Sequence, residues 1–210
     1  MQLIFIRHGQ TAGNLLRRYI GRTDEPLCPQ GIAAVQAAAP DWEPECVFIT
    51  PLLRTQQTAA LLFPHAHQIV IPALREMDFG AFEGRSADEM AEDDAYRAWV
   101  DGGCMTACPA GESRDGFIRR VCDGFVAEAL PLLPPRQEQG VFVVHGGTIM
   151  ALLSQFARPH MDYYSGAVGN GQAVCCRLEY DAQTHAPVFC DVQKAVQLTA
   201  EVRFSNENAV

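Results

Sequence analysis

Short apolar runs alternate along this chain with longer segments in which apolar residues recur at helical spacing. A short apolar run between polar stretches leaves no room for a helix and is typical of a buried strand. Strands are predicted at 3–6, 47–49, 68–71, 141–144, 173–179 and 188–192. Helices are predicted at 11–18, 32–39, 52–63, 86–101 (one helix or two), 112–132 and 148–157. This alternation indicates an α/β fold, a three-layer αβα sandwich around a mostly parallel sheet.

Length and composition fit one soluble, globular domain over residues 1–210. Apolar residues make up 48% of the chain and charged residues 20%, a balance that supports a packed core and argues against disorder. No linker, repeat array or low-complexity segment interrupts the pattern, and only the polar tail after Ala200 is expected to fray.

The net charge of -9 argues against nucleic acid or an anionic membrane as a partner. Its distribution is more informative. No carboxylate precedes Asp24, while Arg7, Arg17, Arg18 and Arg22 all lie in that stretch. An acidic chain that opens with arginines alone suggests a local site for a small anion.

Cysteine usage bears on the compartment. The chain has eight cysteines but no Cys-x-x-Cys pair, and the adjacent Cys175 and Cys176 cannot form an unstrained disulfide. The other cysteines and the histidines are scattered rather than set at the spacing of metal ligands. We find no signal peptide before the first strand, and no apolar run of the roughly 18 residues that a membrane span needs. A cytoplasmic protein with free thiols is therefore expected.

A histidine followed by glycine ends two of the predicted strands. Residues 6–11 read Ile-Arg-His-Gly-Gln-Thr, and residues 144–148 read Val-His-Gly-Gly-Thr. In open α/β sheets, ligands bind beyond the carboxyl ends of the strands, where a helix N-terminus offers free N–H groups to an anion. A lone histidine here is more often a strand-end residue satisfied by backbone, but two in matched settings favour an anion site. The two turns converge on one anion only if their strands lie side by side.

Residues 7–11, Arg-His-Gly-Gln-Thr, resemble the signature of the histidine phosphatase superfamily, which includes the phosphoglycerate mutases. Further segments are similar to this family in its expected order: Asn14, 50–59, 74–76 and 144–147. The departures are small: relatives often have Glu where this chain has Gln10, and Ser where it has Thr50. The resemblance extends from residue 3 to about residue 157 and implies a phosphoglycerate mutase-like fold.

The resemblance implies a phosphomonoesterase that forms a phosphohistidine on His8. Phosphoryl transfer depends mainly on positioning and on stabilising the charge of the equatorial oxygens. Arg7 and Arg54 would do this with planar forks of donors that stay charged. His145 would donate a hydrogen bond to the phosphate, and Asn14 would add an amide donor. Because these groups supply the charge, no metal and no cofactor is expected.

His8 would attack as the neutral imidazole while its other nitrogen donates to a backbone carbonyl. Arg54 stands at a predicted helix start, where a cation is unfavourable unless an anion lies nearby. The remaining candidates for phosphate binding are Gly146, in the second histidine turn, and Gly21 and Arg22, in a stretch that resembles one branch of the family.

The proton donor implied by the resemblance is Glu76, which would protonate the leaving oxygen and later activate water. From the residues alone, Asp78 and Glu83 are equally suitable, and only the resemblance selects Glu76. An acid of this kind needs a pKa raised by burial or by nearby negative charge.

Substrate choice is indicated by three stretches. Residues 18–27, 96–99 and 109–113 are similar to the alpha-ribazole phosphatases of this superfamily, which implies alpha-ribazole 5'-phosphate as substrate, in cobalamin nucleotide loop biosynthesis. The segment at about 85–112 is expected to be a lid insertion over this small-molecule phosphate ester. The aromatic residues and methionine in that segment would pack against an aromatic base, or would only anchor its helices to the core: Tyr96, Trp99 and Met105.

Other functions stay open as alternatives. A broad-specificity sugar-phosphate phosphatase or a phosphoglycerate mutase would use the same residues, and a homodimer is one assembly state to consider. A binding domain without activity is disfavoured because the histidines and arginines that degenerate members lose are present. A nucleotide-binding fold is disfavoured because the chain lacks the glycine-rich phosphate-binding motifs.

Overall fold

The computed structural model describes residues 1–133, 139–196 and 198. Among these residues, six strands form one sheet in the order β3-β2-β4-β1-β5-β6. The strands are β1 (Gln2–Arg7), β2 (Cys46–Ile49), β3 (His67–Val70), β4 (Gln139–Val144), β5 (Ala173–Tyr180) and β6 (Pro187–Val196). Four neighbouring strands, β3, β2, β4 and β1, run parallel. The predicted α/β fold with a mostly parallel sheet is therefore confirmed.

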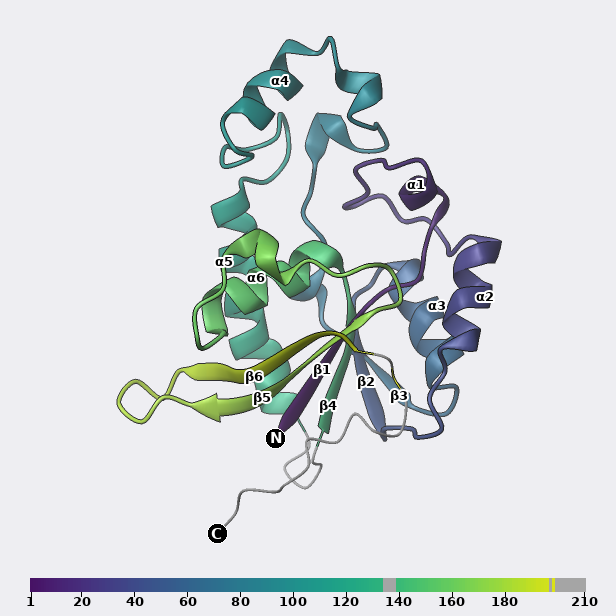
Figure 1. The fold of residues 1–210 in the computed structure, drawn as a ribbon, viewed down its shortest axis with the longest axis vertical. Coiled ribbons are helices and arrows are strands. Elements are labelled where there is room, and N and C mark those ends of the chain that lie inside the picture. The colour runs from purple at the N-terminus through teal and green to yellow at the C-terminus, as the bar shows by residue number, and fades with distance from the viewer. Residues whose placement is uncertain (134–138, 197, 199–210) are drawn as a thin grey trace.

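The last two strands run against the others, a direction that the sequence pattern did not predict. The turn at 181–186 joins them, and a connection this short permits only antiparallel pairing. In Figure 1 this hairpin extends beyond the body of the sheet.

Alternate residues of a strand face opposite sides of the sheet, and both sides are buried here. In β1, Leu3 and Phe5 join one core cluster, while Ile4 and Ile6 join the other. The first cluster is completed by α5 (Arg114–Gly124) and α6 (Gly146–Phe156), and the second by α2 (Pro29–Ala37) and α3 (Leu53–Leu62). Figure 1 shows these helix pairs on the two sides of the sheet, which gives the three expected layers.

The helix after the first histidine turn is shorter than predicted. Thr11 caps it, through a hydrogen bond from the Asn14 N–H, but α1 (Ala12–Leu15) ends well before Arg18. Arg17 adopts a left-handed backbone with φ of 53°, which stops a helix. Beyond it, the N–H of Tyr19 donates to the carbonyl of Arg85, so the chain pairs with the 85–86 segment instead.

The segment predicted as one long helix over 112–132 is coiled throughout but not uniform. Ser113 caps α5, which continues through a wider π-helical turn at Phe125–Ala129 and a tighter 3-10 turn at Leu130–Leu132. Pro131, which has no N–H to donate, lies in the last turn. The 86–101 region forms a 3-10 turn at Asp88–Met90 and then α4 (Asp94–Asp101). Within the described part of the chain, we find no helix with the length and apolarity to cross a membrane.

Candidate active site

The two histidine turns meet because their strands are neighbours. Strands β1 and β4 pair in parallel with Arg7 opposite Val144, so the residues that follow them emerge side by side at the same edge of the sheet. The N–H of His8 donates to the carbonyl of Val144 at 3.0 Å. The rings of His8 and His145 lie 5.2 Å apart between centroids, in an edge-on arrangement.

The His8 side chain is buried and its tautomer is fixed by the backbone. Its Nδ1 lies 2.7 Å from the carbonyl oxygen of Gly9, and because a carbonyl can only accept, Nδ1 must carry the proton. Burial lowers the pKa of His8 well below its usual value, and the charges of Arg54 and Arg7 lower it further. The ring is therefore neutral, and its Nε2 keeps a free lone pair.

The second histidine, His145, is fully buried. Its Nε2 lies 2.9 Å from the Thr50 hydroxyl oxygen, which fixes the plane of the ring. Burial and the nearby Arg54 hold the pKa of His145 well below its usual value as well. The sequence reasoning gave the Thr50 side chain no part in the chemistry, although it is the hydrogen-bond partner of this ring.

The two predicted arginines are anchored by backbone carbonyls. Arg7 donates from Nη1 to the Val168 carbonyl at 2.7 Å. Arg54, at the start of α3, is fully buried and donates from Nη1 to the Thr23 carbonyl at 2.8 Å and from Nη2 to the Gly21 carbonyl at 2.7 Å. Both guanidinium groups lower the pKa of His8.

Four buried side-chain nitrogens have no hydrogen-bond partner within the described chain. The nitrogens concerned are Arg7 Nε, Arg18 Nε, Arg54 Nε and His145 Nδ1. A buried donor without an acceptor costs about 1–3 kcal/mol, so folded proteins rarely keep one without a reason. Three of these nitrogens belong to residues around His8, and an anion bound there would accept from the two arginine nitrogens, and from His145 Nδ1 when that nitrogen carries the proton.

Glu76 closes the site from the segment that follows β3. Its carboxylate accepts from the Met77 N–H at 2.9 Å and from the Gly147 N–H at 3.0 Å. A Cβ at Gly147 would lie 2.2 Å from the carboxylate, so only glycine permits this approach. Burial raises the pKa of Glu76, although both N–H donors and the charges of Arg54 and Arg7 oppose the shift.

The structure distinguishes the three acids that the residues alone left equal. Of these, only Glu76 lines the cavity. The carboxylate of Asp78 accepts from the Gly80 N–H and pairs with Arg22. Glu83 accepts from the N–H groups of residues 21, 22, 23 and 79 and from the Thr23 hydroxyl. It organises the loop whose carbonyls hold Arg54, a role that its sequence position did not reveal.

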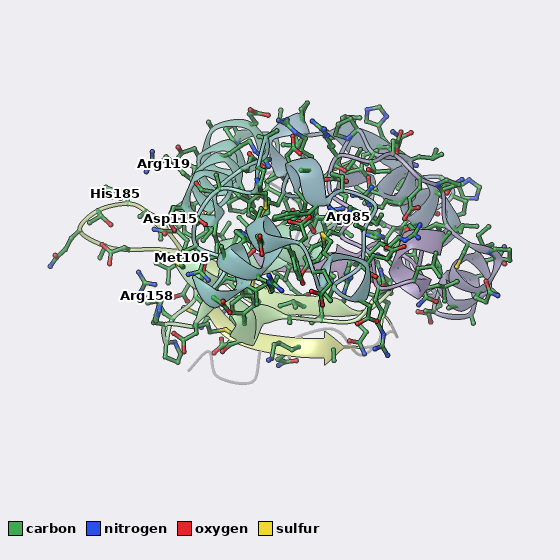
Figure 2. All side chains as sticks on the ribbon, turned by 90° about the horizontal axis from the view of Figure 1, so that it is seen from above. Arg85, Met105, Asp115, Arg119, Arg158 and His185 are labelled. Carbon is green, nitrogen blue, oxygen red and sulfur yellow. The ribbon has the colours of Figure 1, made fainter. Side chains whose placement is uncertain are left out.

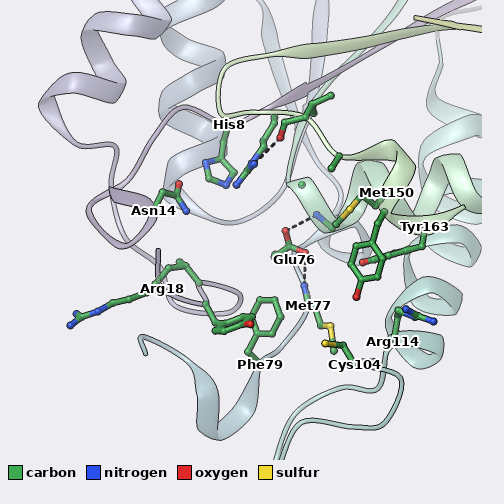
Figure 3. Close-up of a pocket in the computed structure, with 18 of the residues that line it drawn as sticks. His8, Asn14, Arg18, Glu76, Met77, Phe79, Cys104, Arg114, Met150 and Tyr163 are labelled. Carbon is green, nitrogen blue, oxygen red and sulfur yellow. Dashed lines mark hydrogen bonds between the residues drawn. The ribbon is translucent and has the colours of Figure 1, made fainter. Parts of the chain in front are cut away.

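A cavity of about 400 Å³ opens above these groups. Among the predicted site residues, those in its lining are Arg7, His8, Asn14, Glu76 and Gly146. Figure 3 labels three of them, His8, Asn14 and Glu76. Arg54 and His145 lie behind the lining, fully buried. Gly21 and Arg22 are outside it, because the Gly21 N–H is bonded to Glu83 and the Arg22 side chain is exposed and paired with Asp78. The structure therefore gives neither residue a contact with the cavity.

The outer wall of the cavity is largely aromatic. Its side chains include Tyr19, Phe79, Trp99, Arg114, Met150, Tyr163 and Tyr164. Of these, Phe79, Arg114, Met150 and Tyr163 are labelled in Figure 3. The Arg114 guanidinium lies over the rings of Tyr163 and Tyr164, at 5.5 and 5.8 Å from their centroids. Of this set, sequence reasoning proposed only Trp99; Tyr96 is buried outside the lining, and Met105 is exposed. The arginine and the tyrosine pair come from distant segments and share no motif.

Comparison with known proteins agrees with this geometry. The model of the histidine phosphatase superfamily, branch 1, matches residues 3–190. Over 164 residues the chain is 31% identical to a 2,3-bisphosphoglycerate-dependent phosphoglycerate mutase of Methylobacterium radiotolerans, covering 72% of this chain and 76% of that one.

Solved structures agree with the fold. The alpha-ribazole phosphatase of Shigella flexneri is 26% identical, with a TM-score of 0.74 over 90% of this chain and 94% of that one. The phosphoglycerate mutase of Thermus thermophilus is 27% identical, with a TM-score of 0.64 over 93% of this chain and 99% of that one. Because the family match includes both histidine turns and the acid between them, the chain belongs to the histidine phosphatase superfamily, branch 1.

Proposed function

We propose that this protein hydrolyses a phosphate monoester through a phosphohistidine on His8. The observation that carries the proposal is a buried, neutral His8 whose Nε2 lone pair is free, beside the unpaired donors of Arg7, Arg54 and His145. A nucleophile and a set of fixed donors for equatorial oxygens are what phosphoryl transfer requires.

In the first step, His8 Nε2 attacks phosphorus, and the bond from phosphorus to the ester oxygen breaks. Arg7 and Arg54 stabilise the charge on the transferring group, with Asn14 adding an amide donor. If the Thr50 hydroxyl donates to His145 Nε2, the His145 proton resides on Nδ1, the unpaired nitrogen, where it can bind the same oxygens. The positive charge of these groups makes a metal ion unnecessary, and we expect full activity in a chelator.

Glu76 supplies the proton to the leaving oxygen. Its raised pKa keeps it protonated to a higher pH than an exposed carboxyl, as a general acid requires. Once the leaving group has departed, the Glu76 carboxylate takes a proton from water, which attacks the phosphohistidine and releases inorganic phosphate. His8 returns to its neutral form, and the cycle closes.

The leaving group that we propose is an alpha-ribazole, released from its 5'-phosphate in cobalamin nucleotide loop biosynthesis. A nucleoside-like group needs a flat apolar surface beyond the phosphate, and Tyr19, Trp99 and Tyr163 provide aromatic rings in the outer wall. The similarity to an alpha-ribazole phosphatase of known structure supports the same choice. We also propose that the 85–112 segment acts as a lid, since Trp99 and Cys104 contribute to the cavity from it.

A phosphoglycerate mutase activity is the second candidate, favoured by curated relatives of that name and by a cation, Arg114, in the outer wall. A second anionic group on the substrate would find its partner there. A mutase must return the phosphoryl group from His8 to another hydroxyl instead of to water.

Phosphate release from a substrate panel tests these alternatives. The panel comprises alpha-ribazole 5'-phosphate, 3-phosphoglycerate with and without a bisphosphoglycerate primer, fructose 2,6-bisphosphate, a nucleoside 5'-monophosphate and p-nitrophenyl phosphate. We expect the highest kcat/KM for alpha-ribazole 5'-phosphate, with free phosphate as product. Isomerisation of primed 3-phosphoglycerate faster than phosphate release would support the mutase, and equal rates on all alkyl esters would support a broad-specificity phosphatase.

The pH dependence of kcat/KM is expected to be bell-shaped. The rate falls at low pH when His8 gains a proton, at a pKa that burial holds below the usual value of about 6.5. It falls at high pH when Glu76 loses its proton, at a pKa that burial raises. Glu76→Gln should flatten the alkaline limb and leave the acid limb in place. The second ionisation of the substrate affects the wild type and Glu76→Gln equally. An alkaline limb that persists unchanged in Glu76→Gln would therefore contradict the assignment of Glu76 as the general acid.

A further inference from the structure

Glu76 lies in a segment without a regular scaffold of its own. It falls between two short 3-10 turns, Pro72–Leu74 and Gly80–Phe82, and no strand or α-helix includes it. Its carboxylate must nevertheless reach the leaving oxygen with sub-ångström accuracy for proton transfer. The backbone of this segment therefore has to be held from outside.

Arg120, on the inner side of α5, binds backbone carbonyls of this segment. It donates from Nη1 to the carbonyls of Ala73 at 2.8 Å and Arg75 at 3.1 Å, and from Nη2 to the carbonyl of Glu76 at 3.2 Å. Its Nε and Nη2 also bind the two carboxylate oxygens of Glu112, each at 2.7 Å. These five hydrogen bonds use all five donors of the guanidinium.

Glu112 holds the other side of the same segment. Its Oε2 accepts from the Asp78 N–H at 2.9 Å, and its own N–H donates to the Asp78 carbonyl at 2.9 Å. The Arg120–Glu112 pair thus binds the backbone at two points beside the Glu76 side chain. Arg120 binds the Glu76 carbonyl, and Glu112 binds the N–H and the carbonyl of Asp78. Neither Arg120 nor Glu112 lines the cavity, and the Arg120 guanidinium has no donor left for a substrate.

We propose that the Arg120–Glu112 pair positions Glu76 for proton transfer, an inference that rests on the proposed role of Glu76 as the general acid. The pair acts through the backbone, because Arg120 bonds to the Glu76 carbonyl and makes no bond to its carboxylate. A bidentate ion pair in this partly buried setting fixes direction as well as distance, and a lysine could not reproduce the fork.

The test compares two leaving groups. Arg120→Met is expected to lower kcat/KM by about 10–100-fold on the alkyl ester that the wild type hydrolyses fastest, since a misplaced acid fails to protonate an alkoxide. On p-nitrophenyl phosphate, whose phenolate leaves without a proton, we expect a loss of less than about threefold. Glu76→Gln should show the same selectivity with a larger loss on the alkyl ester, on the order of 10²–10⁴-fold.

The matched control is Arg119→Met, one residue earlier on α5. Arg119 is exposed and points away from the fold in Figure 2, so its replacement should change neither rate. The double variant Glu76→Gln/Arg120→Met should be no slower on the alkyl ester than Glu76→Gln alone, because a residue that acts through Glu76 has nothing left to position.

Equal losses on both esters, or a further loss in the double variant, would mean that Arg120 only stabilises the fold and would overturn the inference. Thermal unfolding of each variant identifies a folding defect. If Arg120→Met does not fold, Arg120→Lys takes its place. We expect Arg120→Lys to lower kcat/KM by a smaller factor, and on the alkyl ester alone. Equal losses of kcat/KM on both esters would count against the proposal. If Glu76→Gln itself fails to distinguish the two esters, the assignment of the general acid is wrong, an outcome separate from failure of the Arg120 variants.

Discussion

Replacing His8 with alanine is expected to lower kcat/KM by on the order of 10⁴-fold or more on every ester that the wild type hydrolyses. The change removes the nitrogen that we propose as the nucleophile, and no other side chain in the cavity lining offers a neutral imidazole in its place. Phosphate release measured with p-nitrophenyl phosphate and with the fastest alkyl ester checks the result.

His65→Ala is the matched control, because His65 is exposed and follows α3 on the outside of the fold. Its activity should equal that of the wild type. Phosphate release by His8→Ala at more than a few per cent of the wild-type rate would mean that water attacks the ester directly.

Replacing Arg54 with methionine is expected to lower kcat by about 10²–10³-fold, the usual cost of removing one fixed donor to transition-state charge. Arg54 is fully buried, its Nη groups are held by the 20–23 loop, and its Nε is unpaired, so its geometry is set before substrate arrives. Steady-state kinetics with p-nitrophenyl phosphate measures the loss, with KM expected to change much less than kcat.

Arg54→Lys keeps the charge but cannot match the fork, and we expect it to recover only part of the rate. Arg119→Met again serves as the exposed control. A rise in KM with kcat unchanged would assign Arg54 to substrate binding alone and would contradict its role in the transition state.

The fold followed from the sequence wherever the signal was local. The apolar runs of β1 and β4 are buried on both faces of the sheet, and such strands read as continuous hydrophobic runs. The N-cap at Thr11 is also a local signal, because a threonine side-chain oxygen readily accepts from an N–H of the first helical turn. The early end of α1 was not, because Arg17 turns left-handed where residues 18 and 19 pair with the distant 85–86 segment.

The candidate site could be proposed from the sequence as a set of residues but not as an arrangement. Motifs identified His8, His145 and Glu76, yet only strand order could show that the two histidine turns are neighbours. From the residues alone Glu76, Asp78 and Glu83 are equally suitable, and in the structure their hydrogen-bond partners separate them. The outer wall with Arg114 and Tyr163 depends on contacts between α5 and the 3-10 turn at Tyr163–Gly166, which no single segment encodes.

The central claim is a covalent phosphohistidine on His8, and trapping it is the most direct test. Glu76→Gln with p-nitrophenyl phosphate suits this purpose, because the first step needs no acid while hydrolysis of the intermediate loses its base. We predict a burst of nitrophenolate equal to the amount of enzyme, and, after an alkaline quench and digestion, one phosphoryl group on the peptide that contains His8. The same peptide from His8→Ala should carry none. Turnover without a burst and without a phosphorylated His8 peptide would contradict the account.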